Sequence, residues 1–533
     1  MNKTLALLVR ALRTESRDIK SHLFRLALAV MIVFIVWFGY LSMQVESAPG
    51  RFMFKCMTVA NWAVITLSGG TFFAIAISEE TEQQTLGLLR MANVGPLSLL
   101  LGKWLPRMLT AIVLVSIQFP FTWLTVTLGG VSWEQIWASY LMLLAHLILV
   151  GNVGLLCSVW KPTSAQACGW ALGLMAAYRF FPFLCMGVLL YLNTHGLVDI
   201  QTCQRFGQEV VTPLNLTTAS GRLFGEILST SFKGDAWTTQ VISNFAMGAG
   251  LFLFSWLIFN RATMQHMSGG PQRKSLLVRL LTRTTRSSSA AWDWALGWKD
   301  FRQVAGGFRW IAIKVFLYGS LWGGLLYTWM TLYAMDLFEA VKTACTVVAW
   351  VSGFFLLLES CSLAAKLFRH ELNDHTWSTL LTLPKSLPEI AYSKVAGAML
   401  GLIPTFCVLC ACSSPYIGEI LKDVLRSPPA ILWIIYLLAA TIMGLHLVTF
   451  FSISIDWAVW PIAVVLGAAV AFFGNAFVWV LLAMMMLGIG GTGGGGDGLL
   501  YACLVTLISG NLLLAGLTHY GIGQRLLAKG AQS

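Results

Sequence analysis

The chain has 533 residues, of which 57% are hydrophobic and only 11% are charged, and its formal net charge is +12. Soluble domains carry about 25% charged residues, so this composition excludes a water-soluble protein of such length. Apolar segments of about 20 residues, the length of a membrane-spanning helix, recur along the whole chain. Continuous apolar runs such as Leu26–Tyr40 lack the alternation of a membrane β-barrel. The sequence therefore predicts an all-α integral membrane protein.

The first residues predict an amphipathic helix that lies on the membrane surface. Leu5, Leu8, Val9 and Leu12 recur at helical spacing, with arginines on the other side. A charged N-terminal tail without regular structure is the alternative. The apolar run that begins at Leu26 is too long for the core of a signal peptide, and we predict it to be the first membrane span.

Twelve segments are apolar and long enough to span a membrane, in two groups of six. The predicted spans cover roughly residues 22–44, 54–78, 99–128, 133–158, 167–192 and 239–260, and then 310–333, 342–366, 391–413, 429–453, 458–487 and 498–520. A polar stretch rich in arginine and serine separates the two groups. We therefore predict a first six-helix half over residues 1–265, a basic cytoplasmic linker over 266–290 and a second six-helix half over 291–533.

Lysine and arginine orient the chain in the membrane. With the N-terminus in the cytoplasm, most of the 35 basic residues fall in cytoplasmic segments, whereas the acidic residues divide evenly. Membrane orientation thus explains the positive charge, and nucleic acid is not expected as a partner. We predict a multi-pass protein of the cell (inner) membrane, in contact with membrane lipid and with both termini cytoplasmic. Its longest outside segment, Asn193–Gln240, is expected to contain a short helix at the membrane surface.

The two halves share one layout. Each opens with an amphipathic stretch and continues with two spans, a charged cytoplasmic segment and four more spans. The charged segments align without gaps at one constant offset. The identical pairs are Glu80 and Glu371, Thr85 and Thr376, Leu89 and Leu380, and Lys103 and Lys394. Internal repeats are common in transporters, so the sequence predicts a repeat with its pseudo-symmetry axis along the membrane normal.

Each charged segment predicts a small amphipathic helix in the cytoplasm. Ile77–Arg90 and its counterpart Phe368–Leu381 begin charged and turn apolar, and a proline-containing turn and a lysine-bearing helix follow each of them. The apolar face of such a helix can dock into a groove of a partner protein. An ordinary charged loop between two spans is the alternative.

At these segments the chain resembles the type-2 permease family of ABC exporters. That family has a Glu-rich stretch, then Gly/Thr–Leu–x–x–Leu–Leu, a proline-containing turn and a helix that starts with Gly-Lys. The matching residues are Glu79-Glu80, Thr85-Leu86, Leu88-Leu89, Pro96 and Gly102-Lys103 in the first half, and Glu371, Thr376, Leu380-Leu381, Pro384 and Lys394 in the second, with Ser393 where a glycine is usual. The family usually places six spans in one chain and dimerises, so this chain resembles two such permeases fused.

The resemblance implies that Glu80–Leu89 and Glu371–Leu381 are coupling helices that contact an ATPase. The implied coupling residues are Glu80, Thr85, Leu89, Glu371, Thr376 and Leu380. The implied partner is a separate cytoplasmic ABC ATPase, expected in two copies, that binds ATP and Mg. The chain itself has no G-x-x-x-x-G-K-[ST] motif, so we expect no enzyme activity and no bound cofactor, metal site or catalytic residue in it.

Arg179 lies in the middle of the fifth predicted span, and Glu359 lies within the eighth. A charge at the membrane centre costs about 2.5–3.5 kcal/mol on insertion scales, which favours a place on the transport path or in an inter-helix pair. Snorkelling from a span end is the alternative. Three other functions stay open: an ion-driven secondary transporter with twelve spans, an integral-membrane enzyme, and a non-transporting membrane component of a complex. Nothing in the sequence specifies the transported substrate.

Overall fold

The computed structural model describes most of the chain from residue 49 onward, and all regular structure in that part is helical. The described residues are 49–92, 94–194, 200–229, 232, 234–267, 294–332, 336–373, 376–416, 428–455 and 496–532, with isolated residues between 9 and 36 and between 463 and 478. The predicted span 22–44 and the surface helix before it lie largely outside these residues. So do most of the linker 266–290 and of the predicted span 458–487.

Nine helices in the described residues are long and apolar enough to cross a membrane. They are Gly50–Glu82, Pro96–Thr127, Trp133–Trp160, Thr239–Met264, Gly307–Tyr327, Leu337–Leu372, Leu387–Tyr416, Ala430–Ser454 and Leu500–Ala531. Each of the nine overlaps one predicted span. The predicted span 167–192 lies within a described helix, Ser164–Thr194, that is not one of the nine. The chain is thus an all-α membrane protein.

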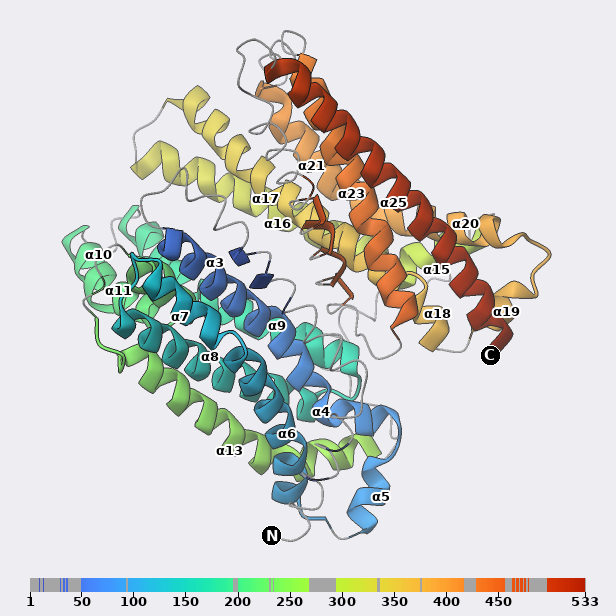
Figure 1. The fold of residues 1–533 in the computed structure, drawn as a ribbon. Helices are drawn as coiled ribbons and strands as arrows, with labels where there is room; N and C mark the ends of the chain where they lie inside the picture. The colour runs from blue at the N-terminus through green and yellow to red at the C-terminus, as the bar shows by residue number, and fades with distance from the viewer. Residues whose placement is uncertain are drawn as a thin grey trace. The chain divides into compact units, whose positions relative to one another are not determined.

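The chain divides into two compact units, Met1–Arg279 and Leu280–Ser533. Each unit packs its helices around apolar clusters of its own, and the blue-to-green and yellow-to-red parts of Figure 1 show their helices. The division falls within residues 266–290, the stretch named above as the linker.

In the first unit, one long helix forms the centre. The helices are α3 (Pro49–Val64), α4 (Gly70–Glu82), α5 (Leu86–Met91), α6 (Pro96–Ser116), α7 (Phe119–Thr127), α8 (Trp133–Trp160), α9 (Ser164–Thr194), α10 (Ile200–Phe206), α11 (Thr212–Leu216), α12 (Ala219–Arg222) and α13 (Thr239–Met267), with π-helical turns η1 (Ile65–Gly69), η2 (Gly207–Val211) and η3 (Leu223–Ile227). The central helix is α8, which packs against α13, α4 and α9 (Figure 1). Its apolar window is 83% buried, the largest share among the nine described spans.

Glycines allow the neighbours of α8 to approach it closely. A Cβ added at Gly154 would lie 2.8 Å from the Phe73 Cβ and 2.9 Å from the Gly70 carbonyl oxygen of α4. A Cβ added at Gly248 of α13 would lie 2.9 Å from the Ile148 Cγ2 of α8. Inside a membrane no hydrophobic effect drives helices together, and van der Waals contact between them does so instead. The close approach of the backbones provides that contact.

The segment between α9 and α13 forms a series of short helical turns, α10 to η3, part of which packs against α8. Arg222 is 1% exposed in this segment, and its guanidinium donates to the carbonyls of Asp235 at 2.9 Å and Ala236 at 3.2 Å. It also pairs with Glu226 at 3.6 Å. The buried arginine thus holds the segment to the start of α13, where the sequence predicted only a short surface helix.

The second unit has two long helices side by side and a surface-type amphipathic helix at its start. Its elements are α15 (Ala295–Gln303), α16 (Gly307–Leu332), α17 (Leu337–Lys366), α18 (Arg369–Asn373), α19 (Trp377–Leu381), α20 (Leu387–Met399), η4 (Leu400–Leu402), α21 (Ile403–Ser413), η5 (Ser414–Tyr416), α23 (Pro428–Ser454) and α25 (Gly496–Gln532). Helices α23 and α25 run along each other (Figure 1), α17 packs on α21, and α15 packs on α20. The short helices α18 and α19 follow directly after α17.

Because α4 and α8 pack so closely, we predict that a larger residue at their contact lowers the stability of the protein. Gly154→Ala should destabilise the protein by about 1–3 kcal/mol, because the added methyl group would overlap α4 and force the helices apart. Gly173→Ala is the matched control, since no atom of the described residues lies within 4 Å of a Cβ added there. Melting temperatures of the purified variants in detergent measure the difference. Equal melting temperatures would contradict this packing of α4 on α8.

Candidate functional site

A carboxylate, a hydroxyl and an ammonium group meet in the first unit where α4 gives way to α5. The carboxylate of Glu80, near the end of α4, accepts hydrogen bonds from the Thr85 hydroxyl and from the Lys103 ammonium group of α6. The backbone N–H of Thr85 also donates to the Glu80 carbonyl at 3.0 Å. Between them, Gln84 has φ 56°, the left-handed conformation of a tight turn. One glutamate thus ties the end of α4, the start of α5 and the next helix together.

The second unit repeats this arrangement at the matched positions. The Glu371 carboxylate accepts hydrogen bonds from the Thr376 hydroxyl and, at 3.0 Å, from Lys394 Nζ. The backbone N–H of Thr376 donates to the Glu371 carbonyl at 3.0 Å, the same distance as in the first unit. Three of the four aligned identities therefore make the same contacts in both units.

The pattern of side-chain burial from the threonine onward is also the same in the two units. Over residues 85–92 and 376–383, the order of buried, half-buried and exposed positions is the same. The second position of each stretch is the anchor: Leu86 is 2% exposed and Trp377 is 1% exposed. The outward positions are Leu88, Met91 and Ala92 in the first unit, and Thr379, Thr382 and Leu383 in the second.

The two predicted coupling leucines, Leu89 and Leu380, are half-buried. Leu89 packs against the apolar cluster around Leu86, and Leu380 packs against the cluster around Trp377. The exposed large hydrophobic side chains of α5 are Leu88, at 66%, and Met91, at 84%. Leu88 belongs to the matching motif, but neither residue is among the predicted coupling residues, although their spacing of three residues places them on one face of a helix.

The last described helix of each unit supports the short helix, a contact that the sequence did not predict. In the first unit, Arg90 of α5 donates to the Asn260 side chain of α13 at 2.7 Å. In the second, the buried Trp377 indole of α19 donates to the Leu526 carbonyl of α25 at 3.0 Å. Helix α25 has 37 residues, whereas a membrane span needs only about 20, so its C-terminal end extends beyond the predicted span 498–520 and reaches Trp377.

In the second unit, the charged cluster extends to α15. Lys299 Nζ lies 2.7 Å from Glu371 Oε1, and Lys394 Nζ lies 2.7 Å from Asp300 Oδ1. The side chains of Lys394 and Asp300 are each 1% exposed. Burial raises the pKa of Asp300, and the positive charge of Lys394 counteracts that rise. No local pattern in the sequence indicates that Asp300 meets Lys394, which is 94 residues away.

The two predicted intramembrane charges each have a partner in their own unit. Arg179 of α9 donates to the Asn215 side chain at 3.0 Å. Glu359 of α17 accepts from Lys314 of α16 and, at 3.2 Å, from the Thr405 hydroxyl. Lys314 lies within the predicted span 310–333 and in the described span Gly307–Tyr327, but it was not named among the intramembrane charges. A role of Arg179 or Glu359 on a transport path remains a prediction.

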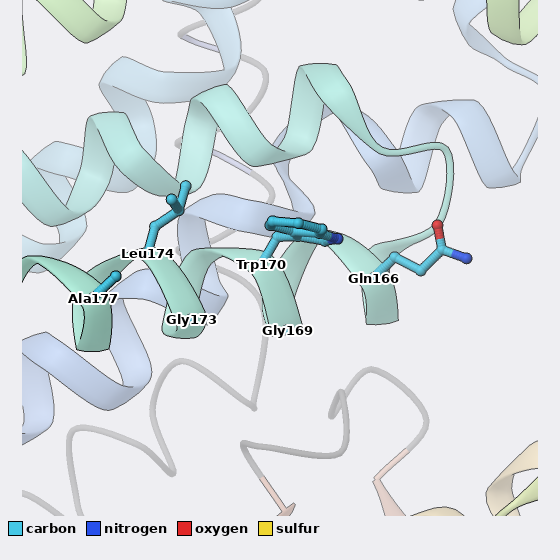
Figure 2. Close-up of a pocket in the computed structure, with 6 residues that line it drawn as sticks. All are labelled: Gln166, Gly169, Trp170, Gly173, Leu174 and Ala177. Atoms are coloured by element: carbon cyan, nitrogen blue, oxygen red, sulfur yellow. The ribbon is translucent and has the colours of Figure 1, made fainter. Parts of the chain in front are cut away.

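An open apolar hollow runs along one face of α9. Figure 2 shows its lining residues, Gln166, Gly169, Trp170, Gly173, Leu174 and Ala177, and its volume is about 520 Å³. None of these six side chains is charged, so the described lining offers no acid or base. In the described parts of the chain, His, Cys, Asp and Glu form no group of three that could hold a metal ion.

The chain matches no protein-family model, and no curated protein sequence matches it. The features of this chain that point to a function are therefore the paired Glu–Thr–Lys sites and the side chains that project outward from α5 and α19.

We predict that the same substitution at the two matched lysines, Lys103 and Lys394, lowers the stability of the protein by unequal amounts. Lys394→Met should cost about 3–5 kcal/mol of stability, because it leaves the buried carboxylates of Asp300 and Glu371 without their shared cation. Lys103→Met should cost about 1 kcal/mol or less, because the Lys103 side chain is 31% exposed and water can solvate Glu80. Thermal melting of both variants checks this. Equal losses would show that burial does not distinguish the two sites.

Proposed function

We propose that this chain is the permease subunit of an ATP-driven ABC exporter, coupled through α5 and α19 to a separate cytoplasmic ATPase. The observation that carries the proposal is the repeated Glu–Thr–Lys site. Each site fixes a helix of only five or six residues in one orientation, with one large side chain anchored inside and others directed outward. A helix so short is unstable alone, so this construction serves to present a surface.

The outward surface of α5 has the chemistry of a protein-docking face. Leu88 and Met91 are exposed, and the exposed polar residues Glu82 and Gln83 precede α5 in the chain. Exposed apolar side chains on one face of a short helix suit a helix that lies in the groove of a partner. The matching face of α19 is more polar, with Thr379 and Thr382 outward, so the two docking contacts differ in chemistry.

In this proposal, the two units are the two six-span halves of one permease, with twelve spans and both termini in the cytoplasm of a cell (inner) membrane. ATP and Mg bind to two ATPase copies that close on each other and carry α5 and α19 with them. The permease then changes between inward-open and outward-open states, because the ATPase binds one of these states better in the presence of ATP. The alignment of Glu80, Thr85 and Lys103 with their counterparts supports two equivalent halves.

Affinity purification tests this proposal. The tagged chain, extracted in mild detergent, should bring an ABC ATPase with it, and Leu88→Asp should remove most of that ATPase. A carboxylate in the centre of an apolar docking face loses its water when the complex forms, and the expected loss of affinity is at least about tenfold.

Leu337→Asp is the matched control, since Leu337 is 60% exposed and begins α17 on the side predicted to lie outside. This control should retain the ATPase. A wild-type preparation without any ATPase, or equal recovery with Leu88→Asp, would refute the proposed docking function.

A further inference from the structure

In the second unit, Glu371 belongs to a ring of four alternating charges. Lys299 Nζ lies 2.7 Å and Lys394 Nζ lies 3.0 Å from Glu371 Oε1. Lys394 Nζ also lies 2.7 Å from Asp300 Oδ1. Lys299 and Asp300 are neighbours on α15, so the backbone of that helix closes the ring. The ring therefore joins α15, α18 and α20 at one point, and Glu371 links it to Thr376 at the start of α19.

The backbones of α15 and α20 also approach each other closely beside the ring. A Cβ added at Gly397 of α20 would lie 2.6 Å from the Gly297 Cα of α15. One turn further along the chain, a Cβ added at Gly401 would lie 2.5 Å from the Ala305 Cβ. This contact of small residues leaves α15 little room to slide on α20, and it brings the Asp300 carboxylate to Lys394.

Stability alone does not account for the buried charges. A buried ion pair is seldom more stabilising than a well-packed apolar contact, because both groups lose their hydration. Asp300 Oδ2 even lacks a hydrogen-bond partner among the described residues. The best-attested use of buried charges is to fix the register of one element on another. The register fixed here is that of α15 relative to Glu371 and hence to α19.

We propose that Asp300 is a positioning residue for coupling: through Lys394 it ties α15 to the base of α19, so that both move as one body when the ATPase acts. This inference rests on the proposed function, because it assigns a role in the transmission of motion from that same docking element. Asp300 itself does not touch the ATPase, since its side chain is 1% exposed. Its effect passes through Lys394 and Glu371 to Thr376, which begins α19.

Asp300→Asn tests this role in the complete permease–ATPase complex, reconstituted in lipid nanodiscs. The asparagine keeps the size of the side chain and an oxygen for Lys394, but it weakens the tie. ATPase recovery and the KM for ATP should stay at wild-type values, and kcat for ATP should fall at least about fivefold. A merely structural role would instead lower the melting temperature and leave kcat of the folded complex unchanged.

A second variant decides the question even if the single variant is poorly folded. Asp300→Asn with Lys299→Gln removes one charge of each sign from the ring and leaves the Glu371–Lys394 pair intact, like the Glu80–Lys103 pair of the first unit. We expect this neutral double variant to fold, to bind the ATPase and to show the same loss of kcat.

Two further variants separate position from charge. Gly397→Ala pushes α15 from α20 without changing a charge, and it should lower kcat in the same way. Glu389→Gln is the control, because it removes an exposed carboxylate, 2.9 Å from Lys385, in the same segment. Its kcat should match that of the wild type.

The outcomes distinguish the two proposals. A wild-type chain that binds no ATPase refutes the proposed function, and the coupling role of Asp300 with it. A complex that assembles normally and whose double variant hydrolyses ATP at the wild-type rate refutes the role of Asp300 alone. Loss of ATPase binding in the folded double variant also refutes it, because Asp300 would then act on docking instead of transmission.

Discussion

The carboxylate at the base of each short helix is the constraint on which the account of this protein depends. An ionised carboxylate that is removed from water needs hydrogen-bond donors to replace the lost water. Glu80 and Glu371 each accept one hydrogen bond from the hydroxyl five residues later in the chain and one from an ammonium group of the next long helix. The hydroxyl and the ammonium group can both reach the carboxylate only if the chain turns sharply after the glutamate. The turn then sets the direction of α5 and of α19, which are too short to hold a direction by themselves.

Hydropathy predicted much of the fold because a membrane span is a long and redundant signal. A window of about 20 residues tolerates several exceptions, so the nine described spans were found despite boundary shifts of several residues. The Glu–Thr–Lys sites were found for a different reason, since an ungapped alignment of two segments compares the chain with itself. That comparison paired Glu80, Thr85 and Lys103 with residues that make the same contacts in the second unit.

The remaining features of the site depend on contacts between distant segments, and these leave no local pattern. Asp300 and Lys394 are far apart in sequence, and so are Lys314 and Glu359. Nothing near either residue of a pair specifies its partner. Burial within a short helix is equally hard to predict, because the neighbours decide it. Leu89, predicted to be a coupling residue, is half-buried, whereas Leu88, which was not among the predicted coupling residues, is exposed.

The two units reach one geometry by different chemistry. In the first, the Glu–Lys pair is partly solvated, and an arginine of α5 donates a hydrogen bond to α13. In the second, the pair is buried with a second carboxylate, and a tryptophan of α19 donates a hydrogen bond to α25. A buried polar cluster is costly to disturb and therefore rigid. The second unit thus holds its short helix more firmly, and the first unit presents the more apolar face.

Site-specific photo-crosslinking in intact cells tests the central claim most directly. A photoreactive amino acid is placed at position 88 or at position 379, which are the matched outward positions of α5 and α19. The account predicts that both positions crosslink to an ABC ATPase, whereas a photoreactive residue at position 337 does not. Crosslinks from 88 and 379 that contain only lipid, or that form with proteins on opposite sides of the membrane, would contradict it.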